Sequence, residues 1–108
     1  MYVLRRIFKV KDPRDARQVA SLLQKQAQIY HDSGQRSEFK VYFNGGTVPG
    51  EPGDVVLEWT DEALMSPMRG GHQLPAAALE IGAQIRPLVE SNRIEFMELM
   101  TPDKMLDV

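Results

Sequence analysis

The chain has 108 residues, enough for one domain with a single hydrophobic core, which we place over residues 1–108. It has 13 Lys and Arg residues against 15 Asp and Glu, and this net charge of -2 gives no general attraction to nucleic acid or to an anionic membrane. It has no cysteine, which excludes disulfides, thiolate nucleophiles and Cys-based zinc sites. No stretch approaches the ~20 apolar residues of a membrane span, and no basic leader precedes an apolar run. We therefore expect a cytoplasmic protein that binds neither nucleic acid nor membrane.

A first strand is predicted near residues 2 to 11, where apolar side chains fall on both faces. One face carries Leu4, Arg6, Phe8 and Val10, and the other carries Val3, Arg5 and Ile7. A strand of this kind suits the centre of a sheet that is covered on both sides. The alternation leaves open which of the two faces meets the helices.

The first helix is predicted to begin after Asp12, an N-cap residue, with Pro13 at the first helical position. Gly34 is the expected stop at its C-terminus. The predicted inner stripe, at helical spacing, is Ala16, Val19, Ala20, Leu23, Ala27 and Tyr30.

Two further strands are predicted near residues 38 to 44 and 54 to 60, since apolar and polar residues alternate in both. The loop between them is rich in Gly and Pro, which indicates a long hairpin turn.

The second half of the chain begins with a segment that Pro67 and the Gly70-Gly71 pair interrupt. We predict a short helical turn over 61 to 65 and then a mobile loop that carries Met68, Arg69 and His72. A second helix follows from near Pro75, and Pro87 should kink its last turn. Its predicted inner residues are Ala78, Ile81, Ile85 and Leu88, with Gly82 allowing close approach to a neighbour. A fourth strand is predicted near residues 93 to 100.

The predicted order is therefore βαββαβ, the ferredoxin-like arrangement of the α+β class. Right-handed crossovers place both helices on one face of a four-stranded antiparallel sheet, with the first and third strands central. The other face is left uncovered. It should carry Lys40, Tyr42, Val56, Glu58, Glu95, Met97 and Leu99, together with one of the two residue sets of the first strand. Because this face is too apolar to remain in water, we expect a homodimer.

Two motifs give the chain a resemblance to a known family. The pattern R-x-[FY]-x-[VL]-K occurs over residues 6 to 11, and Leu57-Glu58-Trp59-Thr60-Asp61-Glu62-Ala63-Leu64 ends the third strand. Here the chain resembles the NIPSNAP-like members of the dimeric α+β barrel superfamily, which also includes antibiotic-biosynthesis monooxygenases and haem-degrading enzymes. The resemblance implies that two sheets pack face to face around a shared cavity. Asp12-Pro13 replaces an expected Gly, and His72 lies farther along the chain than the monooxygenase histidine, so no catalytic residue is transferred.

The candidate site residues are those that offer polar groups to such a cavity. We expect Arg6 or Arg69 to hold an anionic or carbonyl-bearing ligand beside Glu58, with Tyr42 donating a hydrogen bond. His72 is the weak catalytic candidate, for proton transfer near neutral pH, on a loop that could act as a gate. With two distant histidines and no ligand-spaced cluster, we predict no metal and no cofactor.

Each candidate also has a structural explanation. The charged residues of the uncovered face could form cross-strand ion pairs that fix the register. Trp59 could be core under the helices, His72 a solvated loop residue, and His31 a cap for the first helix.

Two functions remain open from the sequence. One is a cofactor-independent monooxygenase or isomerase acting on a small apolar or aromatic compound. The alternative is a non-catalytic ligand-binding or structural homodimer. A ligand-sized void with convergent polar groups favours the first, and a barrel filled by Phe8, Tyr42, Met97 and Leu99 favours the second.

Overall fold

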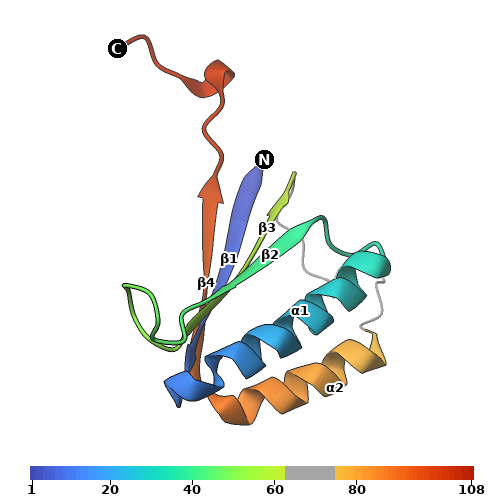
Figure 1. The fold of residues 1–108 in the computed structure, drawn as a ribbon. Helices are drawn as coiled ribbons and strands as arrows, with labels where there is room; N and C mark the ends of the chain where they lie inside the picture. Colours follow the sequence, from blue (N-terminus) through green and yellow to red (C-terminus); the bar gives the residue numbers. More distant parts are fainter. Residues whose placement is uncertain (63–74) are drawn as a thin grey trace.

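The computed structural model describes residues 1–62 and 75–108, and its elements follow the predicted order (Figure 1). They are β1 (Tyr2–Val10), α1 (Ala16–Asp32), β2 (Phe39–Phe43), β3 (Asp54–Asp61), α2 (Ala76–Ile85) and β4 (Val89–Glu98). Short 3₁₀ turns cover Pro13–Asp15, Arg86–Leu88 and Pro102–Lys104. The helical turn predicted over 61 to 65 does not begin at Asp61, which is instead the last residue of β3. The rest of that turn from residue 63 and the loop that carries Met68, Arg69 and His72 lie outside the described residues.

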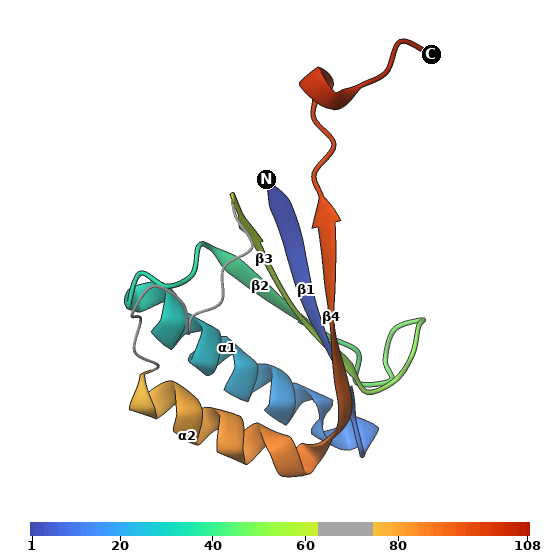
Figure 2. The ribbon, with the colours of Figure 1, turned by 180° about the vertical axis from the view of Figure 1, so that it is seen from behind.

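The four strands form one antiparallel sheet in the order β2-β3-β1-β4, so β1 and β3 are central as predicted. Both helices lie on the same side of this sheet, as two opposite views show (Figure 1, Figure 2). The α+β ferredoxin-like fold is thereby confirmed. We call the side toward the helices the helix-facing side and the opposite side the open face.

The register of β1 decides the question that the alternation left open. Arg5 is aligned with Glu58 on β3 and with Glu95 on β4, so the open face carries Val3, Arg5 and Ile7. Phe8 and Val10 belong to the buried core that β1 shares with α1. Arg6 therefore lies on the helix-facing side, and its predicted place in the lining of the uncovered face is wrong, because successive side chains of a strand point to opposite faces.

The core between α1 and the sheet follows the predicted stripe. All six predicted residues of α1 are buried: Ala16, Val19, Ala20, Leu23, Ala27 and Tyr30. Val19 and Leu23 pack in one cluster with Phe8, Val55 and Ile85. Burial of these side chains is the main force that holds the helices on the sheet.

The first helix starts one turn later than the sequence suggested. The Asp12 carboxylate accepts hydrogen bonds from the Arg14 backbone N–H at 3.0 Å and from the Arg14 guanidinium at 2.8 Å, which supports a 3₁₀ turn before α1. At the other end Gly34 has φ +78°, a backbone conformation that favours glycine, and the predicted stop is confirmed.

The two helices approach closely at Gly82, as predicted. A Cβ atom at this position would lie 3.1 Å from Gln26 Nε2. The same Gln26 nitrogen donates a hydrogen bond to the carbonyl of Ala78 at 3.0 Å, which ties α1 to α2.

Strand β4 begins earlier than predicted. The 3₁₀ turn around Pro87 leads directly into Val89, which pairs with Val10 across a register shift in β1. The additional residues of β4 bring Arg93 into the middle of the strand.

Replacing a fully buried side chain of α1 should be costly. Leu23 is 1% exposed, so Leu23→Ala should lower the free energy of unfolding by about 2–5 kcal/mol through lost burial and a cavity. Leu79→Ala is the matched control, since Leu79 on α2 is 50% exposed and its truncation should change stability by about 0.5 kcal/mol or less. Urea denaturation measures both values, and equal losses would contradict this description of the core.

The Asp12 carboxylate should make stability depend on acid pH. Hydrogen bonds from the Arg14 side chain and backbone hold the pKa of Asp12 below its usual value in the folded state. Its stabilising contribution is therefore complete above the unfolded pKa of about 3.9 and is lost as pH falls through the lower folded pKa. Asp12→Asn keeps an acceptor oxygen but cannot titrate. The difference in melting temperature between parent and variant should shrink in acid, and a pH-independent difference would contradict this role.

Candidate functional site

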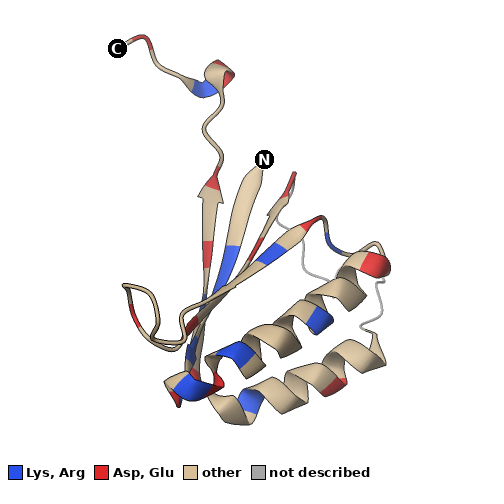
Figure 3. Ribbon diagram, viewed as in Figure 1, with Lys and Arg blue, Asp and Glu red and all other residues tan. Residues whose placement is uncertain are grey.

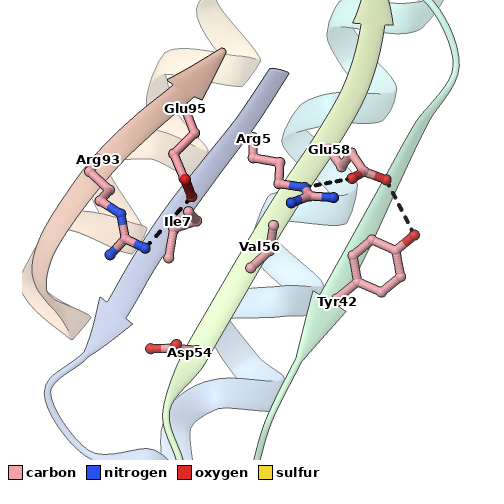
Figure 4. Close-up of a pocket in the computed structure, with 8 residues that line it drawn as sticks. All are labelled: Arg5, Ile7, Tyr42, Asp54, Val56, Glu58, Arg93 and Glu95. Carbon is pink, nitrogen blue, oxygen red and sulfur yellow. Dashed lines mark hydrogen bonds and ion pairs between the residues drawn. The ribbon is translucent and has the colours of Figure 1, made fainter. Parts of the chain in front are cut away.

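The open face contains a hollow of about 440 Å³ to which all four strands contribute (Figure 4). It is lined by Arg5, Ile7, Tyr42, Asp54, Val56, Glu58, Arg93 and Glu95. These side chains meet there because each occupies the open-face position of its strand, as the pairing register shows.

Four of the five charged side chains around the hollow are paired with one another, Asp54 being the fifth. Arg5 Nε donates to Glu58 Oε1 at 2.8 Å, and the Tyr42 hydroxyl donates to Glu58 Oε2 at 3.4 Å. Arg93 Nη2 lies 3.6 Å from Glu95 Oε1. The hydrogen bond and the charge of Glu58 raise the pKa of Arg5. One of the cross-strand ion pairs that the sequence suggested, Arg5–Glu58, is thus formed, whereas Arg93 and Glu95 lie on the same strand.

The structure brings together two of the predicted site residues, Tyr42 and Glu58. The arginine that joins them is Arg5, because Arg6 lies on the helix-facing side. Arg69 and His72 lie outside the described residues. Sequence reasoning missed Asp54 and Arg93, although each stands an even number of residues from Glu58 or Glu95 on the same strand. This spacing was the available signal, and the late predicted start of the fourth strand hid it for Arg93.

A second group of functional side chains gathers on the helix-facing side. The Arg36 guanidinium lies 4.2 Å from the ring centre of Trp59 and 4.8 Å from that of Tyr30. The Arg6 guanidinium lies 5.8 Å from the ring centre of Phe8. We call these five residues the arginine-aromatic cluster.

Neither arginine of this cluster has an acidic partner in the described part of the chain. Arg6 Nε is inaccessible to solvent and makes no hydrogen bond. Burial lowers the pKa of Arg36 to about 10, the Tyr30 hydroxyl opposes this shift, and the positive charge of Arg6 adds to it. Arg36 is therefore held near a second cation in surroundings that disfavour its own charge.

The positions of two aromatic residues near the cluster, Trp59 and His31, agree only in part with those predicted from the sequence. Trp59 lies on the helix-facing side but remains half-buried, with Arg36 over its ring. His31 stands in the last turn of α1, yet its Nδ1 donates to the carbonyl of Arg36 at 3.0 Å, beyond the helix end.

Two other classes of site have no support among the same residues. No group of three or more His, Asp or Glu side chains in 1–62 and 75–108 is arranged to hold a metal ion. No helix in these two ranges is both long and apolar enough to cross a bilayer.

The fold and the uncovered sheet define the class: a ferredoxin-like α+β protein with one sheet face that residues 1–62 and 75–108 leave uncovered. No protein-family model matches the sequence, and the search of curated proteins also finds no match.

Solved structures of the same fold do match, over nearly the whole chain. A protein of Agrobacterium tumefaciens superposes with a TM-score of 0.73 at 16% identity, covering 98% of this chain and all of its own. A NIPSNAP family protein of the same organism gives 0.66 at 16% identity, with 94% and 93% of the two chains covered. An antibiotic biosynthesis monooxygenase gives 0.62 at 12% identity, with 94% and 100% covered. The ferredoxin-like fold of the single chain, which the resemblance to NIPSNAP-like proteins implied, is confirmed, and these identities show the fold alone.

Proposed function

We propose that the protein acts as a cytoplasmic homodimer in which two open faces close on each other and enclose a small polar ligand. The observation that carries this proposal is the hollow on a sheet face that no element of the described chain covers. Tyr42 and Met97 on this face are 49% and 42% exposed in the single chain. A second sheet would remove this apolar surface from water.

The charges of the open face suit a second copy of the same face. Basic and acidic residues are interspersed along the strands (Figure 3). By register, the open face carries Arg5, Lys9, Lys40 and Arg93 together with Asp54, Glu58 and Glu95. An isologous interface brings a patch against itself, so a patch with both signs can be self-complementary where a patch of one sign would repel. The absence of cysteine supports the cytoplasmic setting.

The size and lining of the hollow support a small ligand of polar character. Its volume of about 440 Å³ falls within the range of ~300–1,000 Å³ that ligand sites occupy. Six of its eight lining residues are polar or charged, and Ile7 and Val56 form the apolar remainder. This lining fits a polar ligand better than the apolar or aromatic compound that we expected from the sequence.

A cofactor-independent enzyme of the monooxygenase or isomerase kind is the second candidate. The observation that favours it is the chain of contacts from Arg5 through Glu58 to the Tyr42 hydroxyl. The phenol has a single O–H, which can turn from Glu58 and donate a hydrogen bond to a ligand oxygen, while Arg5 continues to hold the carboxylate. One protein of the same fold is an antibiotic biosynthesis monooxygenase, which supports this candidate by likeness of fold alone.

The dimer can be tested by placing a charge on the open face. Met97→Lys should cost little in a separate chain, because the side chain is already 42% exposed there, but it would bury an unpaired charge in the dimer. Sedimentation should give about twice the 12.2 kDa chain mass for the parent, and the variant should dissociate at micromolar concentration.

Leu79→Lys is the matched control, since Leu79 is similarly exposed but lies on α2, away from the open face. It should leave the assembly intact. A parent that sediments as a monomer, or equal dissociation of both variants, would refute the proposed interface.

The ligand site can be tested by removing one hydroxyl. Small molecules retained by the purified parent would be identified by native mass spectrometry, and binding would then be compared with Tyr42→Phe. Loss of one hydrogen bond of ~0.5–1.5 kcal/mol should weaken binding about 2- to 12-fold.

Tyr2→Phe removes the same group from a tyrosine that does not line the hollow, and it should bind as the parent does. If Tyr42→Phe is dimeric and also binds as the parent does, the hydroxyl makes no ligand contact. If the parent retains no small molecule, the paired charges serve only the interface.

A further inference from the structure

We propose that the arginine-aromatic cluster on the helix-facing side binds the carboxylate of a small aromatic acid, at a site separate from the hollow of the open face. The cluster comprises Arg6, Arg36, Tyr30, Trp59 and Phe8, and the function proposed above does not use it.

Arg6 and Arg36 differ in their ion pairing from other arginines of the same chain. Arg5 is paired with Glu58 at 2.8 Å, Arg14 with Asp12 at 2.8 Å and Arg93 with Glu95 at 3.6 Å. Over residues 1–62 and 75–108, the guanidinium groups of Arg6 and Arg36 make no ion pair and no hydrogen bond. Both side chains are half-buried, unlike Arg17 and Arg86, which are unpaired but exposed to water.

The surroundings of these two cations leave N–H hydrogen bonds unsatisfied and place the positive charges near each other. Ring faces attract a guanidinium, but they do not accept its in-plane N–H hydrogen bonds. Burial takes water away from Arg36, and the nearby charge of Arg6 is repulsive. A bound anion would accept the free hydrogen bonds and neutralise the repulsion. A carboxylate matches the planar fork of a guanidinium, which favours two parallel hydrogen bonds.

Exposed apolar side chains lie beside Arg6. In the sheet register, Ile94 is the direct neighbour of Arg6, and Phe96, Leu4 and Trp59 form the adjacent row across β4, β1 and β3. Ile94 and Phe96 are 47% and 52% exposed although they lie on the helix-facing side. An aromatic ring packed on the exposed Ile94 and Phe96 would bury apolar area while its carboxylate reached the arginines. These two features together define the ligand class.

The test uses benzoate as the probe and benzamide as its neutral counterpart, at constant ionic strength. Trp59 is the single tryptophan of the chain, so its fluorescence reports on the site directly, and calorimetry gives an independent dissociation constant. Benzoate should change the Trp59 emission and saturate. Benzamide should bind at least ~10-fold more weakly, because it lacks the charge that the arginines recognise.

Variants then locate the site. Arg36→Met and Arg6→Met keep an apolar side chain of similar length, and each should weaken benzoate binding at least ~10-fold. Arg17→Met is the matched control, since it removes an exposed arginine of α1, and it should bind as the parent does. Arg36→Lys keeps the charge without the planar fork and should bind with intermediate affinity, which provides a second readout if Arg36→Met is unstable.

Three results would overturn the proposal. The first is benzamide binding as tightly as benzoate. The second is folded Arg36→Met and Arg6→Met variants that bind benzoate as the parent does. The third is binding that Arg5→Met abolishes and Arg36→Met leaves intact, which would place benzoate in the open-face hollow. Since the proposed ligand of that hollow is tested by Tyr42→Phe, either site can fail while the other stands.

Discussion

The pairing of β1 with both β3 and β4 is the constraint on which the rest of the structure depends. It fixes Arg5 between Glu58 and Glu95 on the open face and directs Phe8 and Val10 into the core under α1. A shift by one residue would exchange every side chain between the two faces, so the register is strongly determined by the burial of one of them. The core, the open face and the arginine-aromatic cluster all follow from this register.

The two sides of the sheet differ in whether their arginines are paired with carboxylates. On the open face each arginine has a carboxylate partner, and the surface is nearly neutral and suited to meet a copy of itself. On the helix-facing side Arg6 and Arg36 are surrounded by rings and aliphatic side chains, and acidic partners are absent among the described residues. The first arrangement supports the proposed dimer, whereas the second supports the proposed binding of an anion.

The sequence predicted the fold well because the signals were local and periodic. The stripe of α1, the stop at Gly34 and the close contact at Gly82 were all correct, since each depends on spacing or on a single backbone requirement. The site was harder to predict. Alternation along β1 divides its residues into two sets, but it does not show whether Arg5 or Arg6 lies on the open face, because that depends on which face the helices cover.

The arginine-aromatic cluster could not be predicted from sequence patterns for a related reason. Arg36 follows α1 in a short connection that no periodicity describes, and it meets Trp59 only because β3 returns beside β2. Alternation predicts Trp59 to be core under the helices, but it is half-buried, with the Arg36 guanidinium over its ring. Contacts of this kind depend on tertiary structure, which spacing in the chain does not encode.

Arg5 and Arg6 are consecutive residues, so two surfaces of different chemistry are separated by the thickness of one strand. Evolution can therefore alter either surface by point substitutions at alternate positions of β1 and leave the other unchanged. An insertion or deletion of one residue within this strand would instead damage both surfaces together. The strand should thus tolerate exchange of side chains but not changes in length.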